Sequence, residues 1–274
     1  MFWAGENPVA TLETLGNLGF HCGQIGIPGK LQLDSRLIHA WKKALEQDHF
    51  TVTTVFAAFE GESYADIPTV QRTVGFIPEV TREVRELRIM EVSDIAAQLG
   101  VPSVATHVGF IPEDNTHADY RAVREMVRRV CDHAVSHQQT FAMETGQERA
   151  EVLLDFLLDV NRRNLAINFD PANMILYGTG DPIQSLDVVG QHVVSVHCKD
   201  GDWPPAGVPG ALGTERPLGK GSVNLKAFLA ALKKIGYRGP LTIEREAHDP
   251  EERLRDLRDG KALLEELKLS VLSS

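Results

Sequence analysis

The chain has 274 residues, of which 43% are hydrophobic and 24% charged, and its formal net charge is −10. This length fits one large domain spanning residues 1–274 better than two average domains, and the composition is that of an ordinary globular protein. The acidic balance argues against nucleic acid as a partner, because nucleic-acid binding needs clustered Lys and Arg. No apolar run approaches the ~20 residues that a membrane span requires, so we expect no membrane partner.

The three cysteines, Cys22, Cys131 and Cys198, form no CxxC pair, and such an odd, sparse set indicates reduced thiols. The stretch from Met1 to Glu6 lacks the basic region and the apolar core of a secretory signal. We therefore expect a cytoplasmic protein.

Apolar runs alternate with amphipathic stretches along the chain, which is typical of an α/β protein with a parallel sheet. The apolar runs predict eight strands: Met1–Trp3, His21–Ile27, Thr51–Ala58, Ser103–Val108, Thr140–Glu144, Leu165–Phe169, Val193–His197 and Leu241–Glu244. The amphipathic stretches predict eight helices: Pro8–Gly16, Ser35–Glu46, Glu79–Leu99, Ala118–His137, Arg149–Val160, Asp181–Val189, Leu225–Ile235 and Glu251–Leu269. Several of these helices are followed by Gly or Pro, which end a helix. Eight strand–helix units predict a (β/α)8 TIM barrel.

Four predicted strands end on, or directly before, a residue that can bind a metal ion: Glu144, Asp170, His197 and Glu244. The intervals of 26 and 27 residues each hold about one strand–helix unit, and the last interval of 47 residues holds another unit and a long loop. Residues two apart share a strand face. The residues that share a face with these four are mostly small or polar, and the opposite face is large and apolar, as a helix-covered face should be. We therefore expect all four side chains to point inward at one rim of the barrel.

Three carboxylates and one imidazole suit a single divalent ion, Mn²⁺, Mg²⁺ or Zn²⁺. An ion with four protein ligands keeps positions open for water or for the oxygens of a hydroxy-ketone, whose carbonyl it would polarise. An acid at a strand end can instead cap the following helix, so each residue taken alone has a structural alternative. Because all four residues are expected to point inward at the same rim, we favour the metal site over four separate helix caps.

Five segments combine these candidates with neighbouring Gly, Pro and Asn residues: Met143–Gln147, Asn168–Asn173, His197–Trp203, Pro217–Gly221 and Gly239–Glu246. In these segments most strongly, and over nearly the whole chain after the first strand, the sequence resembles the xylose isomerase-like TIM barrels, which include sugar isomerases, ketose 3-epimerases and endonuclease IV. In the epimerase branch a Glu, an Asp, a His and a second Glu at these strand ends hold one metal ion. The resemblance therefore implies that Glu144, Asp170, His197 and Glu244 are its ligands.

The resemblance also implies a reaction. The two glutamates, Glu144 and Glu244, would lie on opposite faces of a bound ketose and act as the catalytic acid–base pair, through a metal-held enediolate. The partner would be a small-molecule sugar or sugar phosphate. Family habit and exposed aromatic residues indicate a homodimer or homotetramer.

The chain departs from these relatives at informative positions. Endonuclease IV has a His three residues after the Asp of this motif, where this chain has Asn173, and an Asp-x-His near the position of Arg216–Leu218. Half of its trinuclear zinc ligands are thus missing, so we do not expect nuclease activity. Ketose 3-epimerases also tend to carry a His at the Asn173 position and an Arg six residues after the metal His, where this chain has Trp203. We therefore expect different substrate contacts.

Five residues near the predicted rim are candidates for binding the substrate: His107, Asn173, Lys199, Trp203 and Glu246. Lys199 could hold a substrate oxygen or a phosphate, or could pair with a neighbouring acid. Glu246 could instead form a salt bridge, and His107 could be structural. The loops of residues 58–64 and 201–213 mix aromatic residues with Gly or Pro, as lids often do, and Trp203 could form an apolar wall over a sugar.

The main hypothesis is a metal-dependent isomerase or epimerase of a ketose. The nearest alternative is a dehydratase of an inosose-type substrate, because the same enediolate can expel a β-hydroxyl with loss of water. A metal- and sugar-binding barrel without turnover is a second alternative, and an endonuclease IV-like nuclease is a third.

Overall fold

The computed structural model of the protein describes residues 1–273 and contains one eight-stranded parallel sheet whose strand order follows the chain. Its strands are β1 (Phe2–Trp3), β2 (Cys22–Ile27), β3 (Thr51–Ala57), β4 (Ser103–Thr106), β5 (Thr140–Glu144), β6 (Leu165–Phe169), β7 (Val193–Cys198) and β10 (Leu241–Ile243). The backbone nitrogen of Met1 donates a hydrogen bond to the carbonyl oxygen of Ile243, so the two end strands of this order also meet. The predicted TIM barrel is confirmed.

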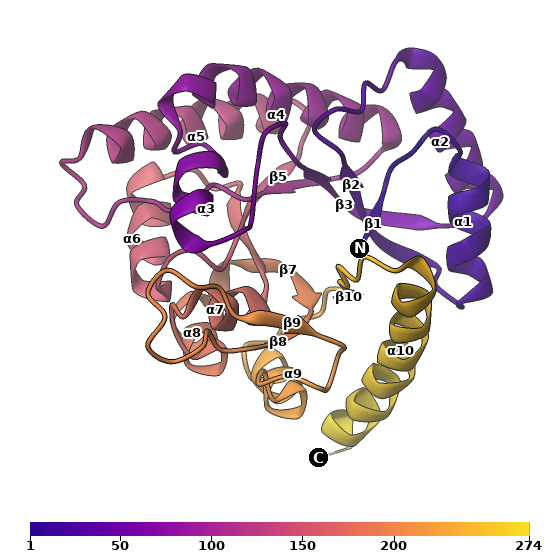
Figure 1. The fold of residues 1–274 in the computed structure, drawn as a ribbon. Helices are drawn as coiled ribbons and strands as arrows, with labels where there is room; N and C mark the ends of the chain where they lie inside the picture. Colours follow the sequence, from indigo (N-terminus) through magenta and orange to yellow (C-terminus); the bar gives the residue numbers. More distant parts are fainter. Residues whose placement is uncertain (274) are drawn as a thin grey trace.

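Helices alternate with the strands and surround the sheet (Figure 1). The eight that follow the barrel rhythm are α1 (Pro8–Asn17), α2 (Ser35–Gln47), α4 (Glu79–Leu99), α5 (Ala118–Ser136), α6 (Ala150–Val160), α8 (Pro182–Val189), α9 (Leu225–Lys234) and α10 (Pro250–Leu272). Their ends follow local chemistry: the side chain of Asp34 caps α2 by accepting from Leu37 N, and Gly100, in the left-handed region at φ 75°, ends α4. Within residues 1–273, every helix is too short or too polar to span a bilayer.

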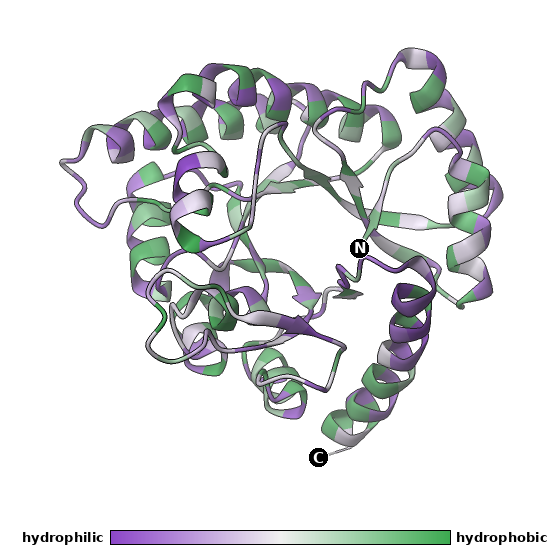
Figure 2. Cartoon of the chain, in the orientation of Figure 1, coloured by the Kyte–Doolittle hydropathy of each residue, from purple (hydrophilic) through white to green (hydrophobic). Residues whose placement is uncertain are grey.

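Two apolar clusters correspond to the two faces of the strands. The large one lies between sheet and helices and includes the completely buried Phe141, Phe169 and Phe228. A small one, made of Phe56, Ala105 and Ala142, lies on the strand face that carries Glu144. Figure 2 shows hydrophobic and hydrophilic residues mixed along each long helix, as expected for helices that cover a sheet on one side only.

The structure adds elements that the sequence pattern did not predict: helix α3 (Ile67–Thr73), helix α7 (Pro171–Tyr177), the turn η1 (Gly190–His192) and an antiparallel hairpin of β8 (Asp200–Asp202) and β9 (Thr214–Arg216). Each is too short to produce a helical or strand periodicity. Two of them had a start signal, because α3 and α7 both begin with an Asp cap followed by Pro. The strand face opposite the candidate ligands was expected to be covered by helices, and this is not so everywhere: Val194, near the amino end of β7, is 43% exposed.

Candidate metal centre at the barrel rim

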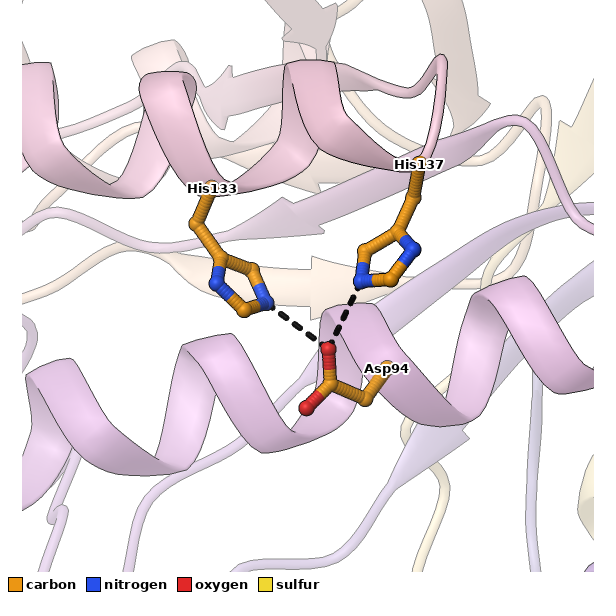
Figure 3. Close-up of side chains that lie close together, drawn as sticks. All are labelled: Asp94, His133 and His137. Carbon is orange, nitrogen blue, oxygen red and sulfur yellow. Dashed lines mark hydrogen bonds and ion pairs between the residues drawn. The ribbon is translucent and has the colours of Figure 1, made fainter.

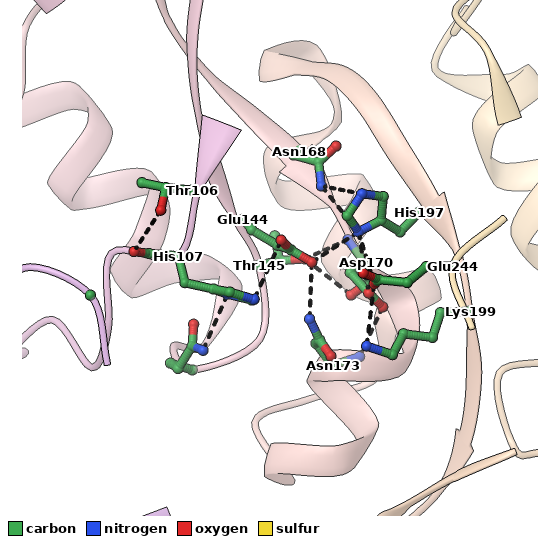
Figure 4. A network of polar contacts seen from close by, with 12 residues as sticks. Thr106, His107, Glu144, Thr145, Asn168, Asp170, Asn173, His197, Lys199 and Glu244 are labelled. Atoms are coloured by element: carbon green, nitrogen blue, oxygen red, sulfur yellow. Dashed lines mark hydrogen bonds and ion pairs between the residues drawn. The ribbon is translucent and has the colours of Figure 1, made fainter. Parts of the chain in front are cut away.

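Four side chains meet at the carboxyl ends of neighbouring strands and form what we call the rim cluster: Glu144, Asp170, His197 and Glu244 (Figure 4). Each offers one ligand atom, and these four atoms lie within 4.8 Å of one another. Asp170 and His197 are completely buried, and the side chain of Glu244 is only 12% exposed. The prediction that the four residues converge on one rim is confirmed.

Asp170 has two oxygens with different roles. Its Oδ1 accepts a hydrogen bond of 2.9 Å from the backbone nitrogen of Asn173, which caps α7. The backbone of Asp170 is held by Thr145, whose Oγ1 accepts from its nitrogen at 2.8 Å and donates to its oxygen at 3.0 Å. The other oxygen, Oδ2, is buried and has no hydrogen bond among the described residues, although Nδ1 of His197 lies 3.6 Å from it. The capping alternative and the metal alternative are thus both possible for this one residue.

A buried carboxylate oxygen without a partner is costly, and it points to a missing positive charge. The pKa of Asp170 is raised to about 6, because burial, together with the charges of Glu144 and Glu244, outweighs the lowering effects of His197 and Lys199. The residues present therefore fit a divalent cation. A divalent cation here would offset two of the three carboxylate charges and could bind Oδ2 directly.

His197 turns one ring nitrogen toward the carboxylates and the other away from them. Its Nδ1 lies 3.0 Å from Oε1 of Glu144 and 3.1 Å from Oε2 of Glu244. Burial by itself would lower the pKa of His197, but the charges of Glu244 and Glu144 outweigh burial and raise this pKa well above its usual value. The point where the ring meets the carboxylates thus favours positive charge, which a proton or a metal ion could supply.

A buried amide orients the far side of this ring. Oε1 of Gln24, on β2, lies 2.9 Å from Nε2 of His197. The amide of Gln24 is itself oriented, because its Nε2 donates at 3.0 Å to Oδ1 of Asn168, which also accepts from the hydroxyl of Ser195. The oxygen of Gln24 therefore faces the ring, and at 2.9 Å it is closer to Nε2 than the amide donor Nδ2 of Asn168 at 3.3 Å, which favours a proton on Nε2 of His197. This tautomer leaves Nδ1 free to bind a metal ion.

Glu144 is held by neighbours on both of its oxygens. Its Oε1 accepts from Nδ2 of Asn173 at 3.1 Å, and its Oε2 lies 3.5 Å from Nε2 of His107. Gly146, at φ +147°, lets the loop after β5 approach α7, because an added Cβ would lie only 2.7 Å from Cβ of Asn173. Nε2 of Gln147 lies 3.4 Å from Nδ1 of His107 and completes this side of the site.

Lys199 lies on the other side of the cluster, next to Glu244. Its ammonium donates to Oε2 of Glu244 at 3.2 Å and to Oε1 of Glu246 at 2.6 Å. Burial opposes the charged form of both Lys199 and Glu244. Their mutual attraction outweighs burial, so the pKa of Lys199 is raised well above its usual value. Lys199 and His197 likewise hold the pKa of Glu244 well below its usual value.

A cavity of about 260 Å³ opens beside the rim cluster, a volume at the small end of ligand pockets. Four of the five predicted substrate contacts line it: His107, Asn173, Lys199 and Glu246. The fifth, Trp203, does not line this cavity, and its place over a substrate stays a prediction. Trp203 directly follows β8 and is 45% exposed, whereas Leu212 and Gly213, further along the loop between β8 and β9, line the cavity.

The sequence pattern missed several residues of the site. Aromatic residues from separate segments line the cavity: Trp3, Phe56, Tyr64 and Tyr177. The ring of Tyr64 lies 5.7 Å from that of His107, so the loop after β3 does reach the site, as expected for a lid. Gln24 was also missed, although one polar residue inside an otherwise apolar strand was a usable signal.

Comparisons with known proteins agree with this geometry. A family model described as xylose isomerase-like TIM barrel matches residues 12–267. The crystal structure of a xylose isomerase domain protein from Planctomyces limnophilus is 40% identical, with a TM-score of 0.92, over 100% of this chain and 98% of that chain.

Two curated proteins are more distant. An uncharacterised protein of Methanocaldococcus jannaschii is 25% identical over 68% of this chain and 64% of its own length. An L-ribulose 3-epimerase of Methylomonas sp. is 34% identical over 40% of this chain and 32% of its own length. The chain thus spans less than two thirds of the length of each of these curated relatives.

Proposed function

This chain belongs to the xylose isomerase-like TIM barrel family, and we propose that it is a divalent-metal-dependent isomerase or epimerase of a ketose. The observation that carries the proposal is the rim cluster, in which three carboxylates and an imidazole bring their ligand atoms within 4.8 Å of one another, and in which the buried Oδ2 of Asp170 has no hydrogen bond among the described residues. The similarity to an L-ribulose 3-epimerase supports the reaction class.

The ligands of the ion would be Glu144, Asp170, His197 and Glu244. Three carboxylates among four ligands favour Mn²⁺ or Mg²⁺, and Zn²⁺ also accepts this set. Bound there, the ion would polarise a substrate carbonyl and make the neighbouring C–H more acidic.

Glu144 and Glu244 are the proposed acid–base pair. They come from β5 and β10, which are separated by β6 and β7 in the sheet, and Figure 4 shows them on two sides of the cluster. One carboxylate would take the proton from the carbon next to the carbonyl, and the other would return a proton from the opposite face, which inverts that carbon. Asn173 and His107 position Glu144, and Lys199 positions Glu244.

The charges around the cavity favour an unphosphorylated sugar. Four glutamates line it, Glu62, Glu215, Glu244 and Glu246, together with the single lysine Lys199. The ammonium of Lys199 already lies between two carboxylates, so a phosphate group would meet more negative than positive charge. We propose a free ketose, whose hydroxyl groups can donate hydrogen bonds to these acids.

Proton exchange in D₂O, followed by NMR, tests the reaction. The wild-type chain is incubated with Mn²⁺ or Mg²⁺ and a panel of ketoses and ketose phosphates, beside Glu244→Gln and the control Glu266→Gln, a change at an exposed position of α10. We expect deuterium next to the carbonyl of a free ketose, a rate lower by about 10²–10⁴-fold in Glu244→Gln, and no change in Glu266→Gln. A chelator should stop the exchange, and added Mn²⁺ should restore it.

The product and the panel decide between outcomes. A product of unchanged mass supports isomerisation or epimerisation, and loss of water would instead indicate a dehydratase. Faster exchange of phosphorylated ketoses than of free ketoses would contradict the proposal of an unphosphorylated substrate and would leave the proposed reaction class intact. Exchange that survives in Glu244→Gln would contradict the assignment of the acid–base pair.

A further inference from the structure

A second group of potential metal ligands lies on the outer helical layer, between α4 and α5. Asp94 on α4 faces His133 of α5 and His137, which directly follows α5, and we call these three residues the seam cluster (Figure 3). The Nε2 atoms of both rings lie 2.8 Å from the same oxygen, Oδ1 of Asp94. All three residues keep contact with solvent, since their side chains are 27%, 31% and 50% exposed for His133, His137 and Asp94.

The helix geometry brings the two rings together. His133 and His137 are four residues apart, so they lie on the same face of α5 one turn apart. Other pairs hold α4 and α5 in register along the same seam, with Arg82 bonded to Asp119 and Arg129 bonded to Glu86. The seam cluster is therefore supported by two long helices, of 21 and 19 residues, whose relative position is fixed elsewhere.

The place in the fold also favours a cation. His133 lies in the last turn of α5, and His137 caps its end. The carboxyl end of a helix carries partial negative charge, which stabilises a positive ion nearby. Because the helices return antiparallel to the strands, this end of α5 lies at the amino-terminal face of the barrel, opposite the rim cluster.

We propose that the seam cluster is a second metal site, which binds a divalent transition-metal ion such as Zn²⁺ or Ni²⁺ through Nε2 of His133, Nε2 of His137 and the carboxylate of Asp94. Two imidazole nitrogens and one carboxylate suit these ions, and solvent can fill the remaining positions. The three ligand atoms lie within 4.8 Å of one another, and a tetrahedral zinc site needs them roughly 3.3 Å apart, which small side-chain rotations provide.

The two sites should differ in selectivity. The rim cluster has three carboxylates and one imidazole, a set that accepts Mg²⁺ and Mn²⁺. The seam cluster has two imidazoles and one carboxylate, and Mg²⁺ binds poorly to nitrogen ligands. A metal ion at the seam would clamp α4 to α5 and stabilise the barrel, with no role in the reaction at the rim. The proposal stands whether or not the proposed reaction is correct.

The test counts metal equivalents. The metal-free full chain is titrated with Zn²⁺ in competition with a chromophoric chelator, and the same titration is made on the double variant His133→Ala/His137→Ala, on Asp94→Asn and on Glu244→Gln. His39→Ala, an exposed position on α2, is the matched control. We expect two equivalents in the wild type and in His39→Ala, one in the double histidine variant, and at least tenfold weaker binding of one equivalent in Asp94→Asn.

Thermal unfolding gives a second readout. Zn²⁺ should raise the melting temperature of the wild type more than that of the double variant, because binding to the folded state alone is stabilising. Mg²⁺ should change the melting temperatures of the wild type and of the double variant by the same amount. If the double variant binds as many equivalents as the wild type, with the same affinity, the seam site is refuted. If Glu244→Gln keeps both the wild-type number of equivalents and the wild-type affinities, the rim site is contradicted and the seam site is not.

Discussion

Glu148 carries a carboxyl group that folding removes from water. It lies in the loop after β5, is 7% exposed, and its Oε1 accepts a hydrogen bond of 2.9 Å from the backbone nitrogen of Ile111. Burial raises its pKa from 4.5 to about 8. Backbone donors favour the charged form of this carboxyl, but burial outweighs them, and no cation among the described residues pairs with it, so the neutral form is favoured.

The sign of the effect follows from proton binding. Between pH 4.5 and about 8 the folded chain keeps the proton on Glu148 and the unfolded chain has lost it, so the free energy of unfolding falls as the pH rises. Each pKa unit corresponds to about 1.4 kcal/mol, so the free energy of unfolding falls by about 5 kcal/mol across the whole interval. The contribution is complete below pH 4.5 and lost above about pH 8.

Glu148→Gln removes this titration and keeps an oxygen that can accept from Ile111. We expect the variant to be equal to or less stable than the wild type at pH 5, because its amide NH₂ must find a partner, and to gain several kcal/mol relative to the wild type by pH 9. Urea unfolding from pH 5 to pH 9 measures the difference, with Glu266→Gln as an exposed control. A constant difference between Glu148→Gln and the wild type across this range would refute the reasoning.

Two further predictions concern the supports of the site. Gln24→Leu should weaken Mn²⁺ binding by about 10–100-fold, because His197 loses the acceptor that fixes its tautomer. Calorimetric titration measures this affinity beside the exposed control Gln47→Leu. Equal affinities of Gln24→Leu and the wild type for Mn²⁺ would contradict the prediction. Asp200→Ala should lower the free energy of unfolding by about 3 kcal/mol or more and raise KM, because the Asp200 carboxylate accepts from three backbone nitrogens of the loop that forms one cavity wall. Urea unfolding and steady-state kinetics check both effects, with Asp259→Ala as the exposed control. An unchanged KM in Asp200→Ala would show that this loop does not contribute to substrate binding.

The rim cluster was predictable because two periodicities coincide. Side chains alternate along a strand, and strand–helix units recur at similar intervals, so polar residues at equivalent strand ends must reach the same rim. That reasoning placed Glu144, Asp170, His197 and Glu244 together without any knowledge of their contacts. It did not extend to Trp203, because a residue beyond the strand end no longer follows the period of the strand.

The sequence pattern did not predict the short elements for a related reason. The seven residues of α7 are too few to show helical periodicity, although Asp170 followed by Pro171 is typical of the start of a helix. The hairpin of β8 and β9 consists of two strands of three residues, and its pairing joins segments separated by a long loop.

The sequence by itself determined the order of the units, the faces of the strands and the rim on which the four side chains of the rim cluster meet, because these depend on local period and spacing. Only the tertiary structure decided which distant side chains support them. Gln24 reaches His197 across 173 positions of the chain, and Asp94 meets His133 across 39. Such contacts depend on how the barrel closes and on how its helices pack side by side, and no local pattern encodes either arrangement.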